Sequence, residues 1–141
     1  YIFQFNLGEQ TDAQVKLTAE LKSLGYEIVD YMNPKCRYFG GDPSVFLSYI
    51  DKADCVLTDS FHASVFSILF KRPFVVFDRK HANGSNMNSR INTLLQMCGL
   101  EDRWGISNVT DALTCDYSGV DHAIDMHKAD SNSYLLNALS H

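Results

Sequence analysis

The chain has 141 residues, of which 45% are hydrophobic and 21% charged, a composition typical of one globular domain that excludes a disordered or fibrous chain. Its formal net charge of -5 argues against a general nucleic-acid-binding protein, because affinity for phosphates requires a basic surface. The four cysteines lie far apart and form no CxxC pair, so we expect reduced thiols in an intracellular protein.

The chain starts with a predicted strand and a predicted amphipathic helix. The β-type run YIFQF predicts a strand at residues 1–5. Thr11 and Gln14 have the spacing of a capping box, which marks the start of a helix, and Gly25 is a typical helix end. The leucines between them recur at the spacing of one helical face: Leu17, Leu21 and Leu24.

A second strand and a second helix follow. The run YEIVDYM predicts a strand at 26–32, and the loop after it, 33–41, contains a proline and a Gly-Gly pair. We expect Asp42 to cap the next helix and Pro43 to take its first position, where a missing N–H costs nothing. The buried stripe of this helix is predicted to comprise Phe46, Tyr49, Ile50 and Ala53.

Apolar strands and helices alternate in the rest of the chain. The run CVLT predicts a buried strand at 55–58, the apolar stretch 63–70 predicts a buried helix, and FVVF predicts a strand at 74–77. A long polar loop is expected at 78–89 and a terminal helix at 133–139. The helix between them is defined by Ile91, Leu94, Leu95 and Cys98 and should end at Gly99.

This alternation predicts the fold class. Strands that alternate with helices form βαβ units, which build a parallel sheet with helices on both faces. The sequence therefore predicts an α/β, Rossmann-like domain.

The polar cluster TDSFH interrupts the apolar sequence where the strand at 55–58 ends. In a parallel sheet, ligands bind beyond the carboxyl ends of the strands, where helix N-termini attract anions. Ser60 is expected to cap the helix or to bind an oxygen of a ligand, and His62 to stand in the first turn. Asp59 and Ser60 are also ordinary capping residues, and a lone histidine beside an apolar helix is more often structural. These residues alone leave both interpretations open.

The segment after the strand at 74–77 should bring more charged side chains to the same edge of the sheet. They are Asp78, Arg79, His81 and Arg90. Two guanidinium groups beside a helix N-terminus suit a ligand that carries phosphate and carboxylate groups. Each arginine alone is also compatible with a solvated position, Arg79 in a loop and Arg90 at the start of a helix.

Three segments together resemble the polysaccharide pyruvyl transferase family: ADCVLTDSFHASVFSILFKRPFVVF, NSRINTLLQMCGLEDR and SNSYLLNAL. Members typically show Ala-Asp, a hydrophobic strand, Thr-Asp-Ser-Phe-His, and an apolar helix that leads to a Pro-Phe strand. The resemblance is strongest between residues 53 and 103. The matching residues are Ala53, Asp54, Thr58 to His62, Pro73, Phe74, Arg90, Leu94, Leu95, Gly99, Leu100, Arg103, Ser133 and Leu136.

The resemblance implies two Rossmann-like domains, as in glycosyltransferase-B enzymes, with the active site between them. Residues 1–141 would be the C-terminal domain, which the start of the sequence inside a strand also favours, and an N-terminal domain would precede them. The implied reaction transfers a pyruvyl group from phosphoenolpyruvate to two hydroxyls of a cell-surface polysaccharide or its lipid-linked precursor. Its products are a pyruvate ketal and phosphate, formed in the cytoplasm or at the inner face of the membrane.

The resemblance also implies roles for the polar residues. His62 is the candidate catalytic acid or base, because imidazole ordinarily titrates near neutral pH. The candidate substrate-binding residues are Ser60, Asp59, Arg90 and Arg79. We expect phosphoenolpyruvate as the donor substrate, no cofactor, and no metal, since no His/Cys/Asp spacing suggests one.

Two alternatives remain open from the sequence. A nucleotide-sugar-dependent glycosyltransferase-like domain would use the same anion site for a diphosphate. A non-catalytic member of the family would bind a ligand or act as a scaffold.

Overall fold

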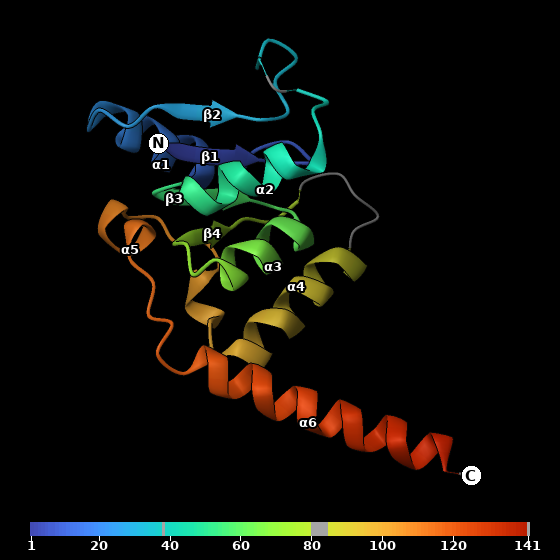
Figure 1. Cartoon of the computed structure of the whole chain (residues 1–141). Helices are drawn as coiled ribbons and strands as arrows, with labels where there is room; N and C mark the ends of the chain where they lie inside the picture. The colour runs from blue at the N-terminus through green and yellow to red at the C-terminus, as the bar shows by residue number, and fades with distance from the viewer. Residues whose placement is uncertain (38, 80–84, 141) are drawn as a thin grey trace.

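The computed structural model describes residues 1–37, 39–79 and 85–140, and these form a four-stranded parallel sheet with helices on both faces (Figure 1). The predicted α/β, Rossmann-like fold is confirmed. The strands are β1 (Ile2–Phe5), β2 (Ile28–Asp30), β3 (Cys55–Thr58) and β4 (Phe74–Val76). The helices are α1 (Asp12–Ser23), α2 (Pro43–Lys52), α3 (Phe61–Leu69), α4 (Ser85–Cys98), α5 (Val109–Leu113) and α6 (Val120–Leu139), with a 3-10 turn, η1 (Glu101–Arg103).

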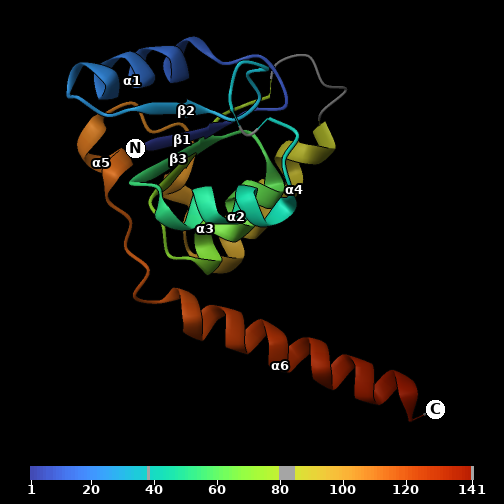
Figure 2. The ribbon, with the colours of Figure 1, turned by 45° about the horizontal axis from the view of Figure 1, so that its top comes forward.

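The sheet has the order β2-β1-β3-β4, so it grows in two directions from its centre. Ile2 of β1 pairs with Ile28 on one side and with Cys55 on the other. The helix α1, which connects β1 to β2, lies on the opposite face of the sheet from α2 and α3 (Figure 2). The chain therefore reverses its direction of growth between β1 and β3, and doubly wound sheets bind their ligands at this point.

Each face of the sheet has its own apolar core, because successive side chains of a strand point to opposite faces. Phe3, Val56 and Val76 face α2, α3 and α4. Ile2, Leu57 and Val75 face the other way, where they pack with Leu17 and Leu21 of α1. Burial of each such large side chain contributes roughly 1.5–3 kcal/mol, so the two cores hold the strand ends rigidly in place.

The boundaries of several elements differ from the predictions. α4 begins at Ser85, so residues 85–89, which were expected in a loop, are helical. Their sequence has weak helix propensity, but Ile91 and Leu95 are fully buried, and such packing outweighs propensity. β2 is shorter than the strand predicted at 26–32. Leu24, which was expected to extend the apolar stripe of α1, is exposed.

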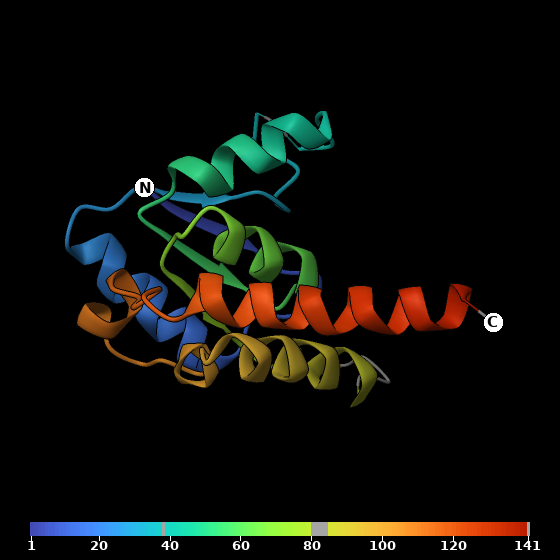
Figure 3. The same cartoon turned by 60° about the horizontal axis from the view of Figure 1, so that its bottom comes forward.

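α6 is much longer than the helix predicted at 133–139. It starts at Val120, which is buried, and it runs along α4 before it projects past the body of the domain (Figure 3). Every residue from Asp125 to Ser140 is exposed. Among the described residues, no helix combines the length and the hydropathy that a membrane crossing requires.

Candidate functional site

The N-terminus of α3 lies at the carboxyl end of β3. The Thr58 hydroxyl donates to the main-chain oxygen of Phe5 (2.5 Å) and accepts from the Ser60 N–H (3.0 Å), which fixes the turn between strand and helix. Ser60 is the N-cap, in an extended conformation, and its side chain accepts from the Ala63 N–H at 3.5 Å. The positive end of the helix dipole lies at this turn, but Ser60 is buried and the Ser60 and Ala63 N–H groups are already bound by side chains of the turn.

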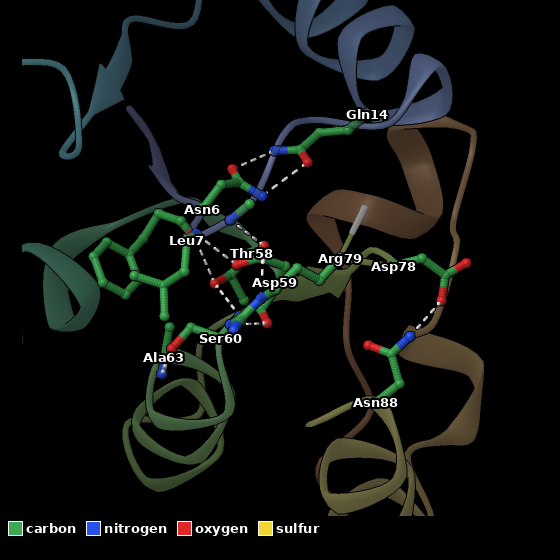
Figure 4. Close-up of polar contacts among 12 residues, drawn as sticks. Asn6, Leu7, Gln14, Thr58, Asp59, Ser60, Ala63, Asp78, Arg79 and Asn88 are labelled. Atoms are coloured by element: carbon green, nitrogen blue, oxygen red, sulfur yellow. Dashed lines mark hydrogen bonds and ion pairs between the residues drawn. The ribbon is translucent and has the colours of Figure 1, made fainter. Parts of the chain in front are cut away.

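Asp59 is buried at the carboxyl end of β3, where the chain reverses its direction of growth across the sheet. Its carboxylate accepts from the main-chain N–H groups of Leu7 and Gly8, both at 2.8 Å (Figure 4). The Nε of Arg79 donates to the same carboxylate at 3.2 Å, and Nη2 donates to the main-chain oxygen of Asp59 at 3.1 Å. One side chain therefore ties together the segments that follow β1, β3 and β4.

The segment after β1 is held by a second, partly buried contact. The side-chain amides of Asn6 and Gln14 form a reciprocal pair, with donor–acceptor distances of 3.0 and 2.7 Å (Figure 4). The predicted cap at Thr11 is present, since its hydroxyl accepts from the Gln14 N–H. The Gln14 side chain, however, pairs with Asn6 and does not complete the capping box. The amide pair fixes the main chain directly before the two N–H groups that bind Asp59.

His62 stands in the first turn of α3, and its side chain is exposed. Its ring contacts Phe61 edge-on, with ring centroids 5.9 Å apart. Arg90 of α4 also contacts Phe61: its guanidinium carbon lies 4.8 Å from the ring centroid, a cation–π distance. The predicted residues His62 and Arg90 therefore both contact the Phe61 ring, in the first turn of α3.

The remaining predicted charges have different surroundings. Arg79 is partly buried, and its bonds to Asp59 use two of the five N–H donors of a guanidinium. Asp78 is exposed and accepts from Asn88 Nδ2 at 3.4 Å. His81 lies outside the described residues.

Cys55 is a nucleophilic residue type on β3, but it begins the strand, at the end away from the site, and its environment makes it unreactive. Its thiol is buried and donates to the main-chain oxygen of Ala112 at 3.2 Å. Burial raises the pKa of Cys55 to about 12, so the thiol is neutral at physiological pH. The exposed imidazole of His62 is better placed than this thiol to exchange protons with a ligand.

The arrangement combines three kinds of group at one edge of the sheet: a helix N-terminus, guanidinium groups and an exposed imidazole. The charge of Asp59 is compensated by Arg79, so it does not oppose the binding of an anion. Such a set can hold phosphate or carboxylate oxygens and can exchange a proton with a bound molecule.

Residues 5–81 match the family described as polysaccharide pyruvyl transferase; they begin at the last residue of β1 and include α1, the TDSFH turn and Arg79. The chain belongs to the polysaccharide pyruvyl transferase family. The resemblance seen in the sequence is thus confirmed at family level, and Arg90 lies just beyond the matched residues. Comparisons with curated proteins and with solved structures give no match.

The structure of this polysaccharide pyruvyl transferase family member shows three site residues that the sequence analysis did not single out. Asn6, Leu7 and Gly8 anchor the site through amide and main-chain groups. The only sequence signal for them was a polar stretch, NLGEQ, at the end of the first strand, the position at which ligand-binding loops of parallel sheets occur.

Proposed function

We propose that this protein transfers a pyruvyl group from phosphoenolpyruvate to two hydroxyls of a sugar and thereby forms a cyclic pyruvate ketal. Family membership supports a polysaccharide pyruvyl transferase. The observation that carries the proposal is the exposed His62 in the first turn of α3, next to the Phe61 ring that Arg90 also contacts. An acid–base group beside cationic groups suits a phosphorylated enol.

The donor carries a phosphate and a carboxylate, and the site offers partners for both. The positive end of the α3 dipole suits one anionic group beside the exposed His62, while Ser60 is buried and caps the helix. The Arg90 guanidinium is exposed and suits the other, while Arg79 supports the same edge from the Asp59 side. In this proposal Asp59 acts on the substrate through Arg79.

The reaction requires two additions to the same carbon. In the first, His62 protonates the terminal methylene, which becomes a methyl group, and an acceptor hydroxyl adds to the central carbon and gives up its proton. In the second, the bond from that carbon to the phosphate oxygen breaks, and the second hydroxyl adds as phosphate leaves with the second proton. The protons lost by the two hydroxyls thus end in the methyl group and in the released phosphate.

We further propose that the acceptor is a sugar of a cell-surface polysaccharide or of its lipid-linked precursor. The pyruvyl transfer would take place in the cytoplasm or at the inner face of the membrane. An N-terminal domain of the same chain would complete the active site. Phosphoenolpyruvate is consumed as a substrate, and the proposal invokes no separate cofactor.

The test is an assay of the full-length protein with phosphoenolpyruvate and a panel of lipid-linked and capsular glycans. Release of phosphate that depends on the glycan, together with a glycan that gains one pyruvate and loses one water, supports the proposal. The same panel with UDP-sugars in place of phosphoenolpyruvate tests a glycosyltransferase. Sugar transfer in that arm without phosphate release in the first would refute the proposal.

A further inference from the structure

A second concave site lies beside the candidate donor site. It is a pocket of about 490 Å³ between α4 and the segment that follows η1, and it is lined by Asn88, Ser89, Asn92 and Trp104. Its volume is within the range of small-molecule sites. None of these four described residues is charged, so the lining consists of two amides, one hydroxyl and one indole.

The pocket is at the same edge of the sheet as the donor site. Trp104 forms an isolated parallel bridge with Val76, the last residue of β4, and the Gly105 N–H donates to the Val76 oxygen at 2.8 Å. The amide Nδ2 of Asn88 bonds to Asp78, the residue directly before Arg79 (Figure 4). Asp78 therefore contacts the pocket through Asn88, and the next residue, Arg79, bonds to Asp59.

The side chains of the pocket are held in a way that leaves hydrogen-bonding capacity. Asn88 makes one long bond, at 3.4 Å, and its Oδ1 is buried with no hydrogen-bond partner in the described part of the chain. A buried amide oxygen without a partner calls for an explanation, and a ligand hydroxyl reached by a small side-chain rotation provides one. Asn92 and Ser89 are exposed on α4, and Trp104 packs against the core with only part of its surface.

We propose that this pocket binds an uncharged sugar ring of the acceptor glycan. A sugar ring presents one apolar face of C–H groups, which suits the indole of Trp104, and a rim of hydroxyls that donate and accept, which suits amides and a serine hydroxyl. An anionic ligand would meet no cation among these four described residues. The pocket adjoins the donor site along the edge of the sheet, so it would hold a ring next to the one that receives the pyruvyl group. This inference rests on the proposed function.

Trp104 is the single tryptophan of the chain, so its fluorescence reports on this pocket. The protein and a Trp104→Phe variant are titrated with the methyl glycosides of galactose, glucose and mannose, and with N-acetylglucosamine. A saturable change in emission that is absent from Trp104→Phe, and that inorganic phosphate does not produce, supports the inference. A response to uridine with none to any sugar would overturn it, as would no sugar response at all.

Kinetics with an unmodified glycan that the full-length protein pyruvylates provide the second arm. We expect Asn92→Ala and Trp104→Phe to raise the KM for the glycan about three- to tenfold, the effect of one hydrogen bond or one aromatic contact, with the KM for phosphoenolpyruvate unchanged. The matched control is Gln96→Ala, which removes an exposed amide one turn further along α4, outside the pocket. Its glycan KM should not change.

The two arms separate the failure of this inference from the failure of the proposed function. A saturable sugar response without glycan-dependent phosphate release would preserve the subsite and overturn the pyruvyl transfer. Pyruvyl transfer with a silent Trp104 and unchanged glycan KM values would preserve the function and overturn the subsite. Both Asn92→Ala and Trp104→Phe leave the backbone of β4 untouched, and circular dichroism checks that each variant is folded.

Discussion

Asp59 and Arg79 form an ion pair across 20 residues of sequence, with the Arg79 Nε 3.2 Å from the Asp59 carboxylate. The side chains are 1% and 14% exposed, so this contact is largely shielded from water. The same carboxylate accepts the N–H groups of Leu7 and Gly8. Three segments of the candidate site thus depend on one carboxylate.

We therefore expect Asp59→Asn to destabilise the protein strongly. The variant leaves the Arg79 charge without its counter-charge. It also replaces one of the two carboxylate oxygens that accept from the Leu7 and Gly8 N–H groups with an NH₂ group, which cannot accept these bonds. Removal of one partner from a buried pair costs about 3–5 kcal/mol of unfolding free energy. Urea unfolding at neutral pH measures this loss.

The control for Asp59→Asn is Asp121→Asn, the same change in an exposed ion pair. Asp121 pairs with Lys71 at 2.6 Å, and their side chains are 69% and 51% exposed. Exposed pairs contribute about 0–1 kcal/mol, so the loss should be small. Equal losses in the two variants would contradict the structural role assigned to Asp59.

His62→Ala is expected to separate activity from stability. The side chain is exposed, so the unfolding free energy should change by less than about 0.5 kcal/mol. If His62 transfers the proton, glycan-dependent phosphate release should fall about 10²- to 10⁴-fold. The comparison is His122→Ala, which removes another exposed imidazole on α6. Wild-type turnover in His62→Ala would remove this residue from the proposed mechanism.

The stability of the protein should fall at alkaline pH because of Cys55. Burial raises the pKa of this thiol to about 12 in the folded state, from an ordinary value of 9.0. Between these values the unfolded chain loses the proton and the folded chain keeps it, so unfolding is favoured as pH rises. The stabilisation is complete below pH 9 and decreases by up to about 1.4 kcal/mol per pH unit above it.

Urea unfolding at several pH values between 8 and 11, about the range in which free thiols titrate, measures this slope. Cys55→Ala removes the titrating group and should make the slope shallower. Some slope should remain, since burial also raises the pKa of Tyr117, whose hydroxyl donates to the main-chain oxygen of Arg72. Identical slopes in the two proteins would show that Cys55 ionises freely in the folded state.

Gly99→Ala should destabilise the end of α4. Gly99 has a φ of +66°, and a Cβ added there would meet nothing within 4 Å, so the whole effect arises from the backbone conformation. The left-handed conformation costs a non-glycine residue roughly 1–2 kcal/mol. Gly119→Ala is the matched control, because Gly119 has a φ of -98° and is equally unobstructed. Gly119 is the N-cap of α6, where alanine is also less favourable than glycine, so thermal unfolding should show the larger fall in midpoint for Gly99→Ala.

Local rules predicted much of the fold. The stop of α4 before Gly99, the cap at Asp42 with Pro43 in the first position, and the strand at 55–58 all agree with the structure. Each depends on a few neighbouring residues, whose preferred backbone angles or hydrogen bonds are visible in the sequence. The position of His62 and Ser60 at the start of α3 followed from the same kind of rule.

The contacts that build the candidate site were not predictable in this way. The buried Gln14 pairs with the partly buried Asn6 instead of completing the expected capping box, and the two residues are eight positions apart in the sequence. The donors that bind Asp59 are main-chain groups of Leu7 and Gly8, and the polar stretch NLGEQ marks their segment without indicating these bonds. The position of Arg90 over Phe61 depends on how α4 packs against α3.

The projecting part of α6 provides a natural reporter. Its amides from Ser133 onward lie in the part of the helix whose residues are all exposed, beyond the residues from His127 to Asn132 that line a hollow with α3 and α4. A helix without tertiary packing opens readily, and its amide hydrogens then exchange with deuterium within a short time. Slow exchange in this segment of the intact protein would therefore reveal that another surface covers it. The factor by which exchange is slowed would measure the stability of that contact.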